Sequence, residues 1–149
     1  MIKASPIAIN WTKVKADKRV ATILVVDDDA ELQKYAALVL GQDYPVLFTS
    51  SGEDALRVAR TAQPDVIILD VMMAGGMDGF ATFCELRKNP ATAHIKVLML
   101  TEVNRATKLR FDIDSMGKYL GASPQAFLEK PIKPERLRQA VAAAIGSAV

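Results

Sequence analysis

The sequence has almost no cysteine and no long hydrophobic run. Cys84 is the single cysteine in 149 residues, which excludes an internal disulfide, and one thiol cannot build a thiolate metal site. No apolar stretch approaches the roughly 20 residues that a membrane span needs, and the first residues lack the apolar core of a secretory signal. These absences predict a cytoplasmic protein in a reducing compartment, without a membrane partner.

The chain does have enough hydrophobic residues for one folded unit. Half of its residues are hydrophobic, which excludes a disordered chain. Its length suits one sizeable core and is short for two, and the sequence contains no internal repeat or low-complexity tract. We predict that residues 21–149 form a single domain, and that residues 1–20 form a basic extension or linker in front of it.

The charge of the first 20 residues differs from that of the rest. This segment has a net charge of +4 and the whole chain +2, which leaves −2 for the remaining residues. A basic segment can contact nucleic acid or an acidic partner. We favour a solvated tail over that alternative, because the segment shows no regular periodicity and no base-stacking pattern.

Short apolar runs alternate along the chain with longer segments of helical pattern. Strand–helix alternation of this kind is typical of a parallel sheet covered by helices on both faces. The sequence therefore predicts an α/β fold, with a doubly wound five-stranded parallel sheet and five helices. The predicted strands are 21–26, 45–49, 65–69, 95–100 and 126–129. The predicted helices are 30–41, 53–63, 80–89, 103–121 and 134–146.

Two helices carry clear signals at their ends. Gly41 is a suitable stop for the first helix. The second helix has two possible capping boxes, Ser50 with Glu53 or Ser51 with Asp54, and the sequence leaves the choice open.

The last helix begins with proline and has apolar residues on one face. Pro134 suits the first helical turn, and Leu137, Val141 and Ile145 follow at a spacing of four residues. We expect these three side chains to pack against the sheet.

Polar residues directly follow four of the predicted strands. Asp27 and Asp28 follow the first strand, Asp70 the third, Thr101 the fourth and Lys130 the fifth. Because ligands bind outside the carboxyl ends of the strands in open α/β sheets, these side chains should meet at one edge. The sequence thus predicts one acidic site that also holds an ammonium group and a hydroxyl.

Three carboxylates in one site need a counter-charge. Two carboxylates about 4 Å apart repel by roughly 4 kcal/mol at an effective dielectric constant near 20. A raised pKa could relieve this repulsion, but a hard divalent cation with oxygen ligands suits an edge open to solvent better. We therefore expect Mg²⁺ as the cofactor, held by Asp28 with the assistance of Asp27.

Such a site fits phosphoryl transfer, which needs a nucleophile in line and charge stabilisation for the phosphoryl oxygens. Asp70 can attack phosphorus as a carboxylate nucleophile, while Lys130 and Thr101 supply a cation and a hydroxyl donor. Each residue alone also has an ordinary role: Asp29 or Asp70 as a helix N-cap, Thr101 as a loop hydroxyl, Lys130 as a surface charge. Their ordered occurrence after successive strands favours the phosphoryl-transfer site.

Several motifs give the chain a family resemblance. ILVVDDD, PDVIILDVMM followed by MDGF, VLMLT, and FLEKP occur in this order over roughly residues 22–146. In this respect the chain resembles the receiver domain of bacterial two-component response regulators. The resemblance implies a flavodoxin-like sheet with strand order 2-1-3-4-5. It implies these site residues: Asp70 as phosphoacceptor, Asp27, Asp28, Asp70 and the Met72 backbone carbonyl as metal ligands, Thr101 and Lys130 on the phosphate, and Phe127 as the aromatic switch.

The resemblance also implies how the domain works. A histidine kinase or histidine phosphotransfer protein would donate the phosphoryl group, and the domain would change its binding of a downstream protein target. It would be a signalling domain that catalyses only its own phosphorylation and dephosphorylation, as a monomer or weak dimer. Since only three residues follow the last predicted helix, we expect no DNA-binding output domain in this chain, unless it was excised from a longer polypeptide.

The chain departs from the family pattern near the predicted site. The loop 73–79 lacks a proline and has one residue more than usual, Glu102 replaces a small residue, and the segment from Thr101 to Lys130 is longer than usual. A receiver-like scaffold that is never phosphorylated therefore stays an alternative. A Mg²⁺-dependent phosphohydrolase is less well supported, because Met72 stands where that class has its second Asp. We expect the only histidine, His94, to lie away from the site.

Overall fold

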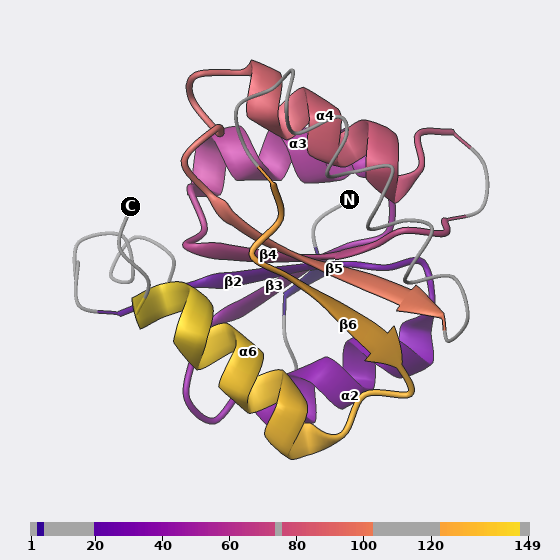
Figure 1. The fold of residues 1–149 in the computed structure, drawn as a ribbon, viewed down its shortest axis with the longest axis vertical. Coiled ribbons are helices and arrows are strands. Elements are labelled where there is room, and N and C mark those ends of the chain that lie inside the picture. The colour runs from indigo at the N-terminus through magenta and orange to yellow at the C-terminus, as the bar shows by residue number, and fades with distance from the viewer. Residues whose placement is uncertain (1–2, 5–19, 74–75, 103–122, 147–149) are drawn as a thin grey trace.

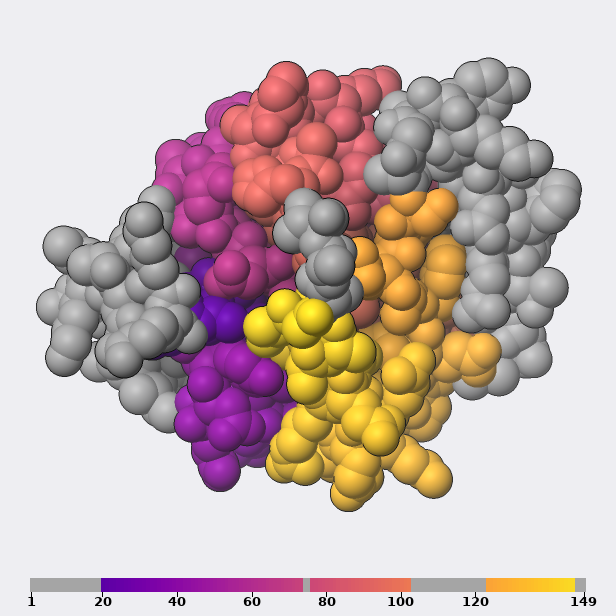
Figure 2. All heavy atoms as spheres, turned by 60° about the vertical axis from the view of Figure 1, so that its left-hand side comes forward, coloured from indigo at the N-terminus to yellow at the C-terminus, as the bar shows by residue number. Residues whose placement is uncertain are grey.

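The structure is a three-layer α/β arrangement with the sheet in the middle (Figure 1). It is a computed structural model, which describes residues 3–4, 20–73, 76–102 and 123–146. Helices α3 and α4 cover one face of the sheet, and helices α2 and α6 cover the other. Figure 2 shows α6 lying beside α2 on the outside of the molecule.

Five parallel strands form the body of the sheet. The strand order is β1-β3-β2-β4-β5-β6, and all pairs from β3 to β6 are parallel. This confirms the predicted order 2-1-3-4-5, because β2 is the first of the predicted strands. The bounds of the parallel strands are Ile23–Val26 for β2, Val46–Thr49 for β3, Val66–Asp70 for β4, Lys96–Glu102 for β5 and Ala126–Lys130 for β6.

A sixth strand, β1, was not predicted. It consists of Lys3–Ala4 and pairs antiparallel with β3 at one edge of the sheet. Two residues are too short to show the alternation by which a strand is recognised in a sequence. The role of residues 1–20 as an extension or linker stays a prediction.

The described residues contain four of the five predicted helices, and the predicted helix 103–121 lies outside them. Ser51 caps α3, because its side chain accepts a hydrogen bond from the Asp54 backbone N–H; this settles the choice between the two predicted capping boxes. Gly41 caps the end of α2 as predicted. The helix bounds are Ala30–Leu40 for α2, Gly52–Ala62 for α3, Gly79–Lys88 for α4 and Pro134–Gly146 for α6. None of these helices is long and apolar enough to cross a membrane.

Alternate residues of each strand face the two helical layers. In β2, Ile23 and Val25 pack with α2 and α6, whereas Leu24 and Val26 pack with α3 and α4. Both sets are buried, which explains the unbroken hydrophobic runs in the sequence.

The predicted contact face of α6 is wrong at its last residue. Leu137 and Val141 are buried, but Ile145 is 37% exposed and Ala144 is buried in its place. Four residues turn a helix by about 40° more than one full turn, so a series at this spacing rotates away from the sheet.

Candidate functional site

The carboxyl ends of β2 and β4 bring three aspartates together. In the register of these strands Val26 lies opposite Leu69, so Asp27 and Asp70, the next residues, are neighbours. One carboxylate oxygen from each of Asp27, Asp28 and Asp70 lies within 4.8 Å of the others. The structure therefore gathers the three carboxylates that the sequence placed after different strands.

The three carboxylates differ in their exposure to solvent. Asp27 and Asp70 are buried, whereas Asp28 is exposed. Burial and, next, the negative charge of Asp27 raise the pKa of Asp70 to about 6, against the opposing effect of Lys130. Asp70 is therefore a carboxylate that is mostly ionised at neutral pH but is costly to keep ionised.

Lys130, the last residue of β6, supplies a positive charge to the site. Its Nζ lies 3.1 Å from Asp27 Oδ2 and 3.4 Å from Asp70 Oδ1. Burial lowers the pKa of Lys130, but the hydrogen bond to Asp27 and the charges of both aspartates outweigh it, and the net pKa is raised. The ammonium group thus stays charged and bridges two carboxylates, which excludes the alternative of an unpaired surface lysine.

Backbone N–H groups hold the two buried carboxylates in place. Asp27 Oδ1 accepts a hydrogen bond of 2.9 Å from the Asp29 N–H, and Asp70 Oδ1 accepts one of 3.3 Å from the Met72 N–H. The Asp29 side chain accepts from the Glu31 N–H and caps α2, so Asp29 has the ordinary role considered for it. These backbone contacts fix the orientation of both carboxylates and involve only the Oδ1 oxygen of each.

Thr101 lies on β5, the strand next to β4, and Phe127 lies on β6, the strand beyond β5. Thr101 is buried at the end of β5, one residue beyond Leu100, which is the partner of Asp70 in the sheet. Phe127 is partly buried, lies opposite Met99 and packs against the core on the α3–α4 side. Both positions agree with the sequence expectation, while the roles of the two side chains remain predictions.

The loop after β4 is constrained by a glycine whose role the sequence did not reveal. A Cβ atom on Gly79 would lie 2.0 Å from the Asp70 carbonyl oxygen, and the Gly79 N–H donates to the Val71 carbonyl. Gly79 was expected at the end of the loop 73–79, but it begins α4 directly against the end of β4. Its missing side chain is what lets the helix start so close to Asp70.

A pocket of about 370 Å³ lies beside Lys130, between α2 and the segment after β6. Its wall includes Tyr35, whose hydroxyl donates to the Ile132 carbonyl. The lining residues are Asp29, Glu31, Leu32, Tyr35, Lys130, Pro131 and Ile132.

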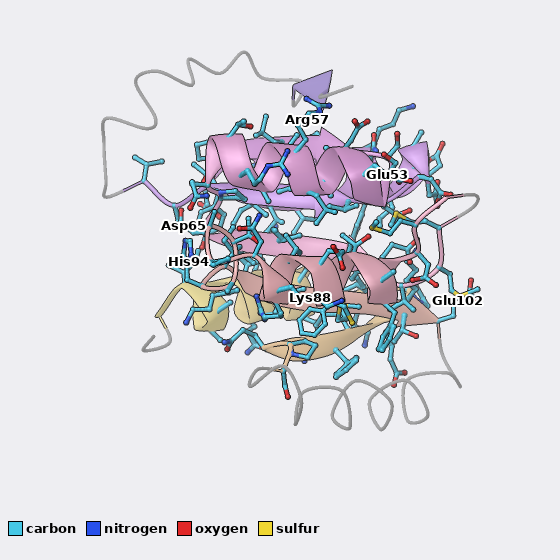
Figure 3. The ribbon with its side chains drawn as sticks, turned by 90° about the horizontal axis from the view of Figure 1, so that it is seen from above. Glu53, Arg57, Asp65, Lys88, His94 and Glu102 are labelled. Carbon is cyan, nitrogen blue, oxygen red and sulfur yellow. The ribbon has the colours of Figure 1, made fainter. Side chains whose placement is uncertain are left out.

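Glu102 and His94 lie at opposite ends of the sheet. Figure 3 shows Glu53 and Glu102 at one end of the molecule and Asp65 and His94 at the other. Glu102 is exposed at the end of β5, on the side of the aspartates, and His94 precedes β5. His94 is thus remote from the site, as expected, and Glu102 adds negative charge to the site's outer edge.

Taken together, the side chains offer oxygen ligands for a cation and a buried carboxylate as a nucleophile. Comparison with known proteins then identifies the family: the model of the response regulator receiver domain matches residues 23–142. The chain belongs to the response regulator receiver family. The family resemblance seen in the sequence is therefore confirmed over most of the chain.

Two curated relatives illustrate the range of receiver proteins. The chain is 32% identical over 126 residues to protein PilH of Pseudomonas aeruginosa, covering 84% of this chain and 98% of PilH. It is 40% identical over 114 residues to response regulator PleD of Caulobacter vibrioides, covering 75% of this chain but 23% of PleD. The chain thus spans about a quarter of the length of one relative and nearly all of the other.

Solved structures of receiver proteins share this fold. A response regulator from Chloroflexus aurantiacus is similar with a TM-score of 0.74 at 31% identity, over 86% of this chain and 99% of that chain. The chemotaxis protein CheY4 of Vibrio cholerae has a TM-score of 0.71 at 29% identity, over 84% of this chain and 98% of that chain. The receiver fold is thus shown by sequence and by structure alike.

Proposed function

We propose that this receiver domain accepts a phosphoryl group on Asp70 and thereby changes its binding to other proteins. The observation that carries the proposal is the placement of Lys130 Nζ between Asp27 and Asp70, in a group of three carboxylates. Two buried carboxylates side by side lower the stability of the fold, because burying like charges is unfavourable. Their presence therefore favours a chemical role for this site over a purely structural one.

The residues fit Mg²⁺ as the cofactor. Carboxylate oxygens are the ligands that this ion prefers, and Asp27, Asp28 and Asp70 provide three of them within 4.8 Å. The family resemblance adds the backbone carbonyl of Met72 as a fourth ligand. When bound, Mg²⁺ supplies positive charge that the phosphoryl oxygens require.

Asp70 would act as the nucleophile in a transfer from phosphohistidine. A carboxylate oxygen forms a bond to phosphorus while the bond from phosphorus to the imidazole nitrogen breaks, and the electron pair stays on the imidazole. Lys130 would stabilise the transferred oxygens with its charge, and the Thr101 hydroxyl would donate to one of them. Because its pKa is about 6, Asp70 is ionised and ready to attack at neutral pH.

The phosphodonor would be a histidine kinase or a histidine phosphotransfer protein in the cytoplasm. The pocket beside Lys130 leaves room next to the site for a donor side chain to approach. After transfer, Thr101 would move toward the phosphoryl group and Phe127 would turn, altering the surface that a downstream protein target contacts.

A receiver-like scaffold that is never phosphorylated is the second candidate. The observation that favours it is Glu102, which is exposed at the end of β5 and would repel an approaching phosphoryl group. Turnover of a separate phosphate ester is disfavoured, because Met72 stands two residues after Asp70, where a general acid would be needed.

The intact mass of the protein after incubation with Mg²⁺ and a small acyl phosphate tests the proposal. We expect the mass to increase by one phosphoryl group, and the increase to be absent in Asp70→Asn. Asp29→Asn is the matched control, because Asp29 lies beside the site but serves as the cap of α2, and it should be phosphorylated normally. An unchanged wild-type mass while Mg²⁺ is bound would favour the scaffold.

A further inference from the structure

The two edges of the sheet differ in how they are protected from pairing with another chain. At the β6 edge, Glu129 and Lys130 lie within the strand and Pro131 follows it. Charges and proline at an edge oppose the addition of a further strand. At the other edge, β3 has the sequence VLFT, which contains neither charge nor proline, and all four residues are buried.

The backbone of β3 directs part of its hydrogen-bonding capacity outward. The Ile23 N–H donates to the Pro45 carbonyl, and the Asp27 N–H donates to the Thr49 carbonyl. Since both backbone groups of a strand residue point to the same side and alternate along the strand, Val46 and Phe48 face away from β2. Their N–H and C=O groups are therefore available to a strand on the outside.

Strand β1 covers this edge. Lys3 lies opposite Phe48 and Ala4 opposite Leu47, in antiparallel register. Because the backbone groups of Phe48 point outward, the N–H and C=O of Lys3 face β3, whereas those of Ala4 point away from it. The cover is only two residues long and is joined to β2 by residues 5–22.

The geometry points to a self-association surface at the β3 edge, which Lys3–Ala4 keeps covered. Its partner is β3 of a second copy of this chain, paired antiparallel about a two-fold axis. β1 shows that an extended antiparallel strand fits here. A second β3 offers the same outward donors and acceptors and the same uncharged sequence, so the contact is self-complementary. A strand tethered to the same chain has an effective concentration of about millimolar. In a dilute solution of the protein it therefore occupies the β3 edge in preference to a second copy.

Proline substitutions at Lys3 and Ala4 test this inference, because the register of β1 predicts an effect at Lys3 and none at Ala4. Lys3→Pro removes the N–H that faces Phe48, and Ala4→Pro removes one that faces away from β3. Lys3→Ala controls for the lost charge. The measurements are the oligomeric state by analytical ultracentrifugation over a range of concentrations, and backbone hydrogen exchange at Phe48, with circular dichroism to verify the fold.

In dilute Lys3→Pro we expect exchange at Phe48 to become about tenfold faster or more, because the edge is uncovered. At higher concentration the variant should form dimers, and protection at Phe48 should return. Exchange at Leu47, whose N–H faces β2, should stay unchanged throughout, and wild type, Lys3→Ala and Ala4→Pro should remain monomeric. A monomeric Lys3→Pro at every concentration would overturn the proposal, as would a dimer without renewed protection at Phe48. None of these measurements requires phosphorylation.

Discussion

Asp70 shows how a side chain with a proposed function can oppose the stability of the fold that holds it. Burial and the neighbouring Asp27 raise the pKa of Asp70 from 3.8 to about 6. A carboxyl whose pKa is higher in the folded than in the unfolded state binds a proton more readily when folded. The free energy of unfolding therefore falls as pH rises from about 4 to about 6, and the loss persists at neutral pH.

Asp70→Asn should accordingly stabilise the protein without metal at neutral pH. After allowance for solvent screening and for the lost contact with Lys130, we expect a gain of about 1–2 kcal/mol at about pH 8 and a clearly smaller gain at about pH 5. Urea unfolding at both pH values measures the difference. A gain that is equal at both pH values would show that ionisation of Asp70 is not its cause.

The identity of the clustered residues was largely predictable, but their individual environments were not. Asp27, Asp28, Asp70 and Lys130 follow strands that a parallel sheet must align. The sequence could not show that Asp27 and Asp70 are buried while Asp28 is exposed, since burial depends on the helices packed around the site. It also gave no sign that Tyr35 lines a neighbouring pocket, because that contact joins segments 97 residues apart.

At the scale of elements, helix ends are where local sequence and structure agree best. The cap of α3 involves Ser51 and Asp54, three residues apart, so it needs no tertiary contact. The choice between Ser50 and Ser51 nevertheless depended on where the preceding strand ends. β3 ends at Thr49, and Ser50 remains exposed between the two elements.

Ser51→Ala should lower the free energy of unfolding by about 1 kcal/mol, because the Asp54 N–H loses its hydrogen-bond acceptor. Ser50→Ala is the matched control and should change it by less than about 0.5 kcal/mol. Urea denaturation of the two variants beside the wild type gives both values. Equal losses in the two variants would contradict the assignment of the cap.

The junction of β4 and α4 depends on the absence of a side chain at Gly79. A Cβ there would lie 2.0 Å from the Asp70 carbonyl oxygen, which belongs to the backbone and cannot move alone. Gly79→Ala should therefore destabilise the fold by more than about 2 kcal/mol and weaken phosphorylation of Asp70. Thermal unfolding and the intact-mass assay measure these effects.

Gly146→Ala provides the control for that substitution. Gly146 ends α6, and a Cβ there would meet no atom within 4 Å. Because alanine favours helix over glycine, we expect a neutral or slightly stabilising effect of up to about 1 kcal/mol. A similar loss of stability in both variants would indicate that the contact at Asp70 is not responsible.

For the whole molecule, the site exists only when the sheet is assembled. Asp27, Asp70 and Lys130 come from β2, β4 and β6, which lie far apart in the sequence and meet only in the folded protein. A cation that binds Asp27, Asp28 and Asp70 binds the folded state alone, so it should stabilise the entire domain.

Mg²⁺ should therefore raise the midpoint of thermal unfolding of the wild type. At a free concentration of about 100 times the dissociation constant, the expected stabilisation is about 2.7 kcal/mol. In Asp28→Asn the effect should be much weaker, because one ligand of the three is changed, and in Asp29→Asn it should be retained. Equal stabilisation of the two variants would place the ion elsewhere.

The sequence by itself determined the class of fold and the residues that end the strands at the site, and its family resemblance implied the order of the parallel strands. The class of fold follows from local properties, namely the periodicity of strands and helices and the caps of helices. The rules for parallel sheets then place the residues that end each strand at one edge. Tertiary structure decided what depends on neighbours distant in sequence. It set the raised pKa of Asp70, the bridging position of Lys130, the close approach at Gly79 and the strand β1 on the edge of β3, because burial and pairing are made by segments that meet only after folding.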